Sequence, residues 1–83
     1  MNKVSVEVFV PSIGKKYDFL LPNAMSINDA SELIHKAICD FEGLMYTSRE
    51  IPQLCSVESE KIINGVLTVE SAGIRDGCRL VLV

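Results

Sequence analysis

The sequence predicts an α+β domain in which one helix packs on one face of a mixed sheet of four to five strands. Three observations predict this class: period-2 alternation of apolar residues in 4–21, a helical apolar stripe in 27–41, and an apolar run at 80–83. The chain has 83 residues, of which 48% are hydrophobic, enough for one modest core. Residues 1–83 are therefore predicted to form a single domain.

Two strands are expected near the start of the chain. Valines alternate with other residues across 4–10, which is the pattern of a half-buried strand. The segment Pro11 to Gly14 interrupts this pattern, and Tyr17, Phe19 and Leu21 then alternate with less buried positions. These features predict a hairpin.

A helix is expected to begin after Ser26, whose hydroxyl can cap it, with Asp29 near the positive end of the helix dipole. Gly43 is suited to end it. Cys39 falls on the side of the helix opposite the apolar stripe and is expected to face away from the core. The predicted stripe contains Ile27, Ala30, Ile34, Ala37, Ile38 and Phe41.

The second half of the chain is predicted to contain three shorter strands. Residues 44–53 are interpreted as a loop, with a short helical turn as the alternative. Strands at 54–57 and 61–63 and a turn at Asn64-Gly65 follow. The last strand leads to Val83 and is expected to lie in the middle of the sheet, in parallel with the first strand. A parallel neighbour requires a long connection, which this part of the chain provides.

Composition excludes several functions. The net charge is −3 and the basic residues do not cluster, so we expect no nucleic-acid partner. No signal peptide or membrane span is evident, which predicts a cytoplasmic protein without direct membrane insertion. Cys39, Cys55 and Cys78 do not have the spacing of a metal site, so free thiols in a reducing compartment, with no metal and no cofactor, are expected.

Catalysis is not expected. His35 is the one imidazole and lies beside the apolar stripe, where a histidine is usually a boundary residue. Cys78 enters the last strand and is interpreted as a small packing residue, while Asp76 can equally cap a turn or serve a partner. The five glycines are explained by turns and caps, so no phosphate-binding loop is predicted.

Protein binding is the remaining hypothesis. If Leu80 and Leu82 point to the helix, Val81 and Val83 point to the opposite, open face of the sheet. The same alternation puts Phe9 and Leu20 on that face, and Ile13 lies in the hairpin loop near its rim. The predicted partner-binding residues are Phe9, Ile13, Leu20, Val81 and Val83. The alternatives are that scattered exposed apolar residues are ordinary, or that the register differs by one residue.

Several segments resemble known ubiquitin-like sequences. The run Thr68-Val-Glu-Ser-Ala-Gly-Ile74 resembles a turn of ubiquitin, Gly14-Lys15 its first hairpin, and Ser26-Ile27 its helix start. The segments Tyr17-Asp-Phe-Leu-Leu21 and Ala72 to Leu82 resemble the YukD family, the ubiquitin-like proteins of bacterial type VII (WXG100, ESX-like) secretion systems.

This resemblance implies a ubiquitin-like β-grasp fold and a non-catalytic, cytoplasmic accessory or regulatory component of a type VII secretion system. Its implied partners are membrane or ATPase components of the secretion machinery, which would hold it at the inner face of the membrane. Weak homo-oligomerisation is also considered. Residues 45–53 match no pattern of the family, so contacts there are not implied.

Two other function classes stay open. A protein modifier or sulfur carrier shares the fold but needs a terminal Gly-Gly tail, which the sequence to Val83 lacks and which a longer native chain would have to supply. The chain is alternatively the cytosolic docking domain of a larger membrane protein. An RNA-binding β-grasp domain is disfavoured by the acidic charge balance.

Overall fold

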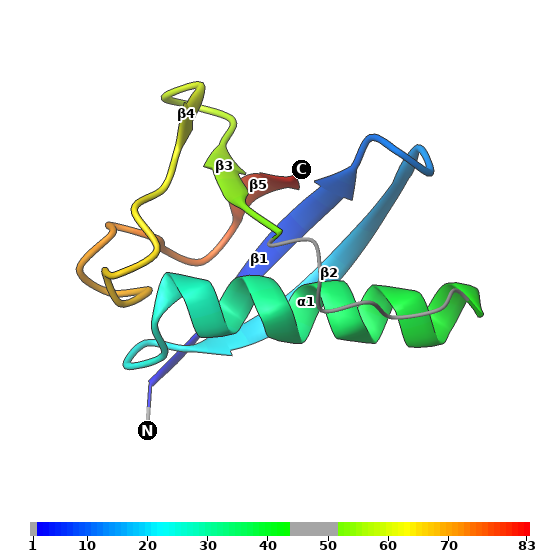
Figure 1. The fold of residues 1–83 in the computed structure, drawn as a ribbon. Helices are drawn as coiled ribbons and strands as arrows, with labels where there is room; N and C mark the ends of the chain where they lie inside the picture. The colour runs from blue at the N-terminus through cyan, green and yellow to red at the C-terminus, as the bar shows by residue number, and fades with distance from the viewer. Residues whose placement is uncertain (1, 44–51) are drawn as a thin grey trace.

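A computed structural model describes residues 2–43 and 52–83 and shows one helix packed against one face of a five-stranded mixed sheet (Figure 1). The elements in chain order are β1 (Lys3–Val10), β2 (Lys15–Pro22), α1 (Ile27–Glu42), β3 (Leu54–Ser56), β4 (Lys61–Ile62) and β5 (Cys78–Leu82). The predicted class is confirmed. Most of the loop expected at 44–53 lies outside the described residues.

The last strand occupies the middle of the sheet, whose order is β2-β1-β5-β3-β4. It pairs in parallel with β1, where Val8 lies opposite Leu80, and antiparallel with β3, where Leu54 lies opposite Leu82. These aligned residues share the helix-facing side of the sheet and are all buried. The predicted register, with Leu80 and Leu82 toward the helix, is therefore confirmed.

The helix termini match the sequence prediction. The Ser26 hydroxyl accepts a hydrogen bond of 3.1 Å from the backbone N–H of Asp29, and Gly43 ends the helix in the left-handed conformation with φ 66°. The N–H groups of Ile27 and Asn28 donate to the carbonyls of Leu67 (2.8 Å) and Gly65 (3.0 Å). These bonds attach the helix start to the segment that leads to β5.

Two helix positions differ from the prediction. Cys39 is buried, with 5% of its surface exposed, whereas Phe41 is 68% exposed. The buried face also includes Ser31, whose hydroxyl donates to the Ile27 carbonyl at 2.8 Å, so the face is rotated toward Ser31 and Cys39. Phe41 instead stacks on the Tyr17 ring of the edge strand β2, with ring centroids 6.1 Å apart.

The turn before β5 is fixed to β1. The Ser5 backbone N–H donates to Asp76 Oδ1 at 2.8 Å, and the Ser5 carbonyl accepts from the Gly77 N–H at 2.8 Å. Gly77 has φ 83°, a value that glycine tolerates best. The Asp76 carboxylate therefore ties this turn to β1, next to the start of the parallel pairing of β1 with β5.

The alternation along β5 generates a prediction about two adjacent residues. Leu82→Asp should abolish cooperative unfolding, because an unpaired buried carboxylate costs several kcal/mol and a domain of this size has only about 3–5 kcal/mol of stability. Val81→Asp should stay folded, because its carboxylate can reach solvent on the open face. Urea unfolding followed by circular dichroism checks both, and equal unfolding of the two variants would contradict the observed register.

A candidate protein-interaction surface

Four apolar side chains lie side by side on the open face of the sheet. The strand registers place Phe9 opposite Val81, Val81 opposite Cys55, and Cys55 opposite Ile62. We call Phe9, Val81, Cys55 and Ile62 the apolar row. Ile62 is 58% exposed and the other three are half-buried. The row crosses β1, β5, β3 and β4 without a charged residue.

Val83 extends this surface beyond the end of β5. Its backbone exchanges two hydrogen bonds with Gln53, of 3.0 and 3.1 Å. Because side chains alternate along an extended segment, Val83 lies on the same face as Val81, and it is 62% exposed. The predicted residues Phe9, Val81 and Val83 are therefore brought together.

The other two predicted residues lie elsewhere. Leu20 is 60% exposed and faces the open side opposite Ser5, but Asp18 and Glu7 stand between it and the apolar row. Ile13 packs against the core cluster, so it does not belong to the open face. The hairpin loop gives no alternation from which the orientation of Ile13 could be inferred.

A charged row borders the apolar row. Asp18, Glu7 and Arg79 lie opposite one another on β2, β1 and β5. Lys16 lies opposite Phe9, at the β2 end of the apolar row, and its Nζ is 3.7 Å from Glu7 Oε1. The open face therefore offers a central apolar strip with mixed charges along one side, an arrangement suited to a protein surface.

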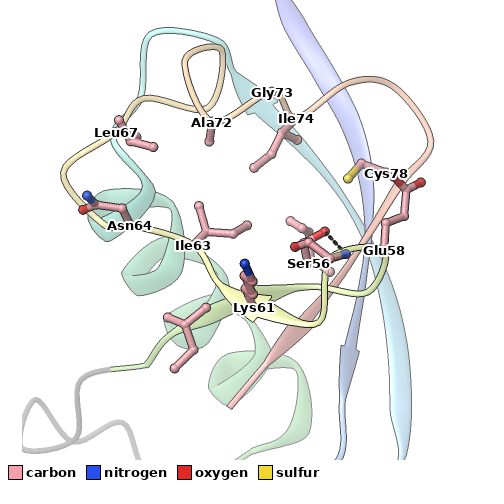
Figure 2. A pocket seen from close by; sticks show the side chains of 13 residues that line it. Ser56, Glu58, Lys61, Ile63, Asn64, Leu67, Ala72, Gly73, Ile74 and Cys78 are labelled. Carbon is pink, nitrogen blue, oxygen red and sulfur yellow. Dashed lines mark hydrogen bonds between the residues drawn. The ribbon is translucent and has the colours of Figure 1, made fainter.

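A pocket of about 370 Å³ opens on the helix-facing side of the sheet (Figure 2). Its walls include Ile63 and Ile74 from the segment before β5, and Cys78 from β5 itself. Glu58 and Lys61 stand on the β3–β4 side. Cys78 also packs against the core, as predicted, and His35 on α1 does not line the pocket. The lining can receive apolar groups, but it does not pair a thiol with an imidazole for nucleophilic chemistry.

The described parts of the chain hold neither a metal-binding cluster nor a membrane-spanning helix. Among residues 2–43 and 52–83, no three His, Cys, Asp or Glu residues are placed to hold a metal ion. Within those same ranges, no helix is both long and apolar enough to cross a bilayer.

A cluster of three titratable side chains, Tyr17, Glu42 and Lys15, links the end of α1 to β2. Glu42 accepts hydrogen bonds from the Tyr17 hydroxyl and from Lys15 Nζ, which lies 3.0 Å from Oε2. The bonds from Lys15 and Tyr17 lower the pKa of the Glu42 carboxyl, and the bond to Glu42 raises the pKa of Tyr17 to about 12. Because Glu42 on α1 bonds to Tyr17 and Lys15 on β2, the cluster is explained as a tie between helix and sheet.

No protein-family model and no curated protein matches the sequence, but solved structures match the fold. The ubiquitin-like domain of the Mycobacterium tuberculosis type VII secretion system protein ECCD1 is 17% identical, with a TM-score of 0.68, over 100% of this chain and 99% of that chain. A chain of the MycP5-free ESX-5 inner membrane complex is 20% identical, with a TM-score of 0.77, over 100% of this chain and 21% of that chain.

A third matching structure is a chain of an enzyme complex. A chain of the toluene 4 monooxygenase HD complex with the inhibitor 4-bromobenzoate is 7% identical, with a TM-score of 0.80, over 98% of this chain and 96% of that chain. At these identities the likeness establishes a ubiquitin-like fold and leaves function to the surface of this chain.

The Tyr17–Glu42–Lys15 cluster predicts how stability depends on pH. The folded-state pKa of Glu42 is lowered, so the free energy of unfolding should fall as the pH drops from about 4.5 through that folded-state value. The folded-state pKa of Tyr17 is raised from 10.0 to about 12, so the free energy of unfolding should also fall as the pH rises through that interval.

Urea unfolding at a series of pH values measures both losses of stability. Glu42→Gln should reduce the loss of unfolding free energy at acidic pH. Tyr17→Phe should reduce the loss at basic pH and leave the acidic loss largely unchanged. If both variants kept the wild-type profile, the cluster would not be formed in solution.

Proposed function

We propose that this chain is a non-catalytic, ubiquitin-like protein-interaction module that acts as an accessory or regulatory component of a bacterial type VII secretion system, in the manner of the YukD family. The observation that carries the proposal is the apolar row, a strip of neighbouring apolar side chains on the face of the sheet that α1 does not cover. Contiguous exposed apolar surface on a small domain commonly marks a contact site.

The comparisons support the secretion setting. One of the structures described above is a domain of a type VII secretion system protein, and another is part of the ESX-5 inner membrane complex. The partners proposed for this chain are therefore membrane or ATPase components of such a machine. Binding to them would hold a cytoplasmic module at the inner face of the membrane without insertion of its own.

The geometry favours binding over catalysis. His35 is half-buried on α1, where its Nε2 lies 3.8 Å from the sulfur of Cys39. Cys39 is itself buried, so this pair does not present a thiol to a substrate. The exposed features of the sheet are apolar and charged side chains arranged in rows, which suit a protein partner.

A second candidate is the cytosolic docking domain of a larger membrane protein. The chain spans 21% of the length of the ESX-5 complex chain that it matches, so a domain of this fold is there one part of a longer polypeptide. The same open face would then bind within one complex. The two candidates differ in whether the module is separable from the membrane protein, which fractionation of the native protein by size distinguishes.

Two exposed residues of one face provide the test. Ile62 in the apolar row is 58% exposed and Leu20, outside it, is 60% exposed. Tagged wild type, Ile62→Asp and Leu20→Asp are used to capture proteins from detergent-solubilised host cells. Ile62→Asp should reduce recovery of secretion ATPase or membrane subunits about tenfold or more, because it puts a carboxylate at the apolar contact, and Leu20→Asp should not.

Circular dichroism and urea unfolding of all three proteins provide the control for folding. Equal recovery by the two variants would exclude the apolar row as the contact site. If no protein, including wild type, recovered a secretion subunit, the secretion function itself would be rejected.

A further inference from the structure

The outer edge of β2 has unpaired backbone N–H and carbonyl groups at every second residue. Ser5 directs its N–H and carbonyl toward the β5 side, as its bonds to Asp76 and Gly77 show. Backbone groups alternate along a strand, so the even-numbered residues of β1 bond to β2. Their partners on β2 are Tyr17, Phe19 and Leu21. The Asn23 N–H follows the same alternation, because it donates a 3.0 Å bond to the Asn2 carbonyl.

The backbone groups of Lys16, Asp18 and Leu20 consequently point away from β1. β2 stands at the edge of the sheet, eight residues long, and no described strand pairs with its outer side. Figure 1 shows β2 at this end of the sheet, with β1 as its neighbour. An edge of this length is a template for another strand unless something opposes the pairing.

On this edge Asp18 faces a like charge and has no ion-pair partner among the described residues. Its cross-strand neighbour on β1 is Glu7, another carboxylate, and like charges directly opposite one another destabilise a sheet. Within residues 2–43 and 52–83, no salt bridge involves Asp18, while Glu7 itself is approached by Lys16. A cation arriving on the outer side of β2 would relieve this repulsion.

We propose that two copies of this chain associate through antiparallel pairing of their β2 strands, centred on Tyr17. This register places Lys16 of each copy opposite Asp18 of the other. It makes two opposite-charge pairs across the twofold axis, and it joins residues whose backbone groups already point outward. The two sheets thereby become one continuous sheet.

Other symmetric registers are disfavoured by the same residues. Centring on Lys16 or on Asp18 places identical charges opposite one another. Centring on Phe19 places Lys16 opposite Pro22, which has no N–H to donate. Centring between two residues pairs an outward-facing residue with an inward-facing one, so the ladder cannot form. Lys15 and Lys16 also oppose the addition of strands that lack an acidic residue at the matching position.

This inference goes beyond the proposed function and does not depend on it, because it rests on the outward backbone groups and charges of β2 and not on the apolar row. The test is sedimentation equilibrium of wild type, Lys16→Asp and Asp18→Lys, each alone and then the two variants mixed in equal amounts. Both side chains are exposed, and urea unfolding of each variant controls for the loss of the Lys16–Glu7 ion pair. Each variant alone should associate about tenfold or more weakly than wild type, because both cross-axis pairs become repulsive.

The mixture should recover association as a heterodimer. One chain then carries aspartate and the other lysine at both positions, so both cross-axis pairs attract. Amide hydrogen exchange at rising concentration should protect Lys16 and Asp18, whereas Tyr17 and Phe19 are already bonded within the sheet.

Three results would overturn the inference. Wild type that stays monomeric to about millimolar concentration, beyond the weakest range of specific association, would exclude the dimer. A mixture that gains no association would exclude the charge pairs. Ile62→Asp provides the matched control on the apolar row, and loss of self-association in that variant alone would place the contact on the open face.

Discussion

The parallel pairing of β1 with β5 is the constraint on which the rest of this structure depends. It places the last strand in the middle of the sheet, with the hairpin β1–β2 on one side and the short strands β3 and β4 on the other. A parallel neighbour cannot be reached by a tight turn, so the chain must travel a long way between β4 and β5. That connection covers part of the sheet, caps the helix start through the carbonyls of Gly65 and Leu67, and ends at the bond between Asp76 and Ser5.

The same central strand gives the two faces of the sheet their different characters. Leu80 and Leu82 complete the core beneath α1, while Val81 joins Phe9 and Cys55 on the opposite side. An antiparallel sheet with one solvated face usually carries polar residues there. The apolar strip on this face is therefore the feature that most needs a functional explanation, whereas the cluster of Tyr17, Glu42 and Lys15 is explained by the attachment of the helix.

Regular periodicity made much of this fold predictable from sequence. The alternating valines of β1 and the run at 80–83 identified which residues face the helix, and Ser26 and Gly43 identified the helix ends. The apolar row was only half predicted, because β4 has two residues and cannot show a period. The register of β4 follows from a turn in which Glu60 has φ 56°, and no residue pattern in the sequence predicts that conformation. Cys39 was misplaced because Ser31, although polar, can be buried once its hydroxyl bonds to the backbone.

The position of Asp76 and β5 in the chain also bears on how the domain is made. During synthesis β1 and its hairpin partner leave the ribosome first, and β3 and β4 follow well before Cys78–Leu82. Until that last strand arrives, the inner edge of β1 is open and β3 has no neighbour on that side. The nascent domain thus passes through a stage with a gap in its sheet, which only its final strand can fill. Loop-closure entropy makes such a late, non-local step slow, so the growing chain exposes an unpaired inner edge that the finished domain conceals.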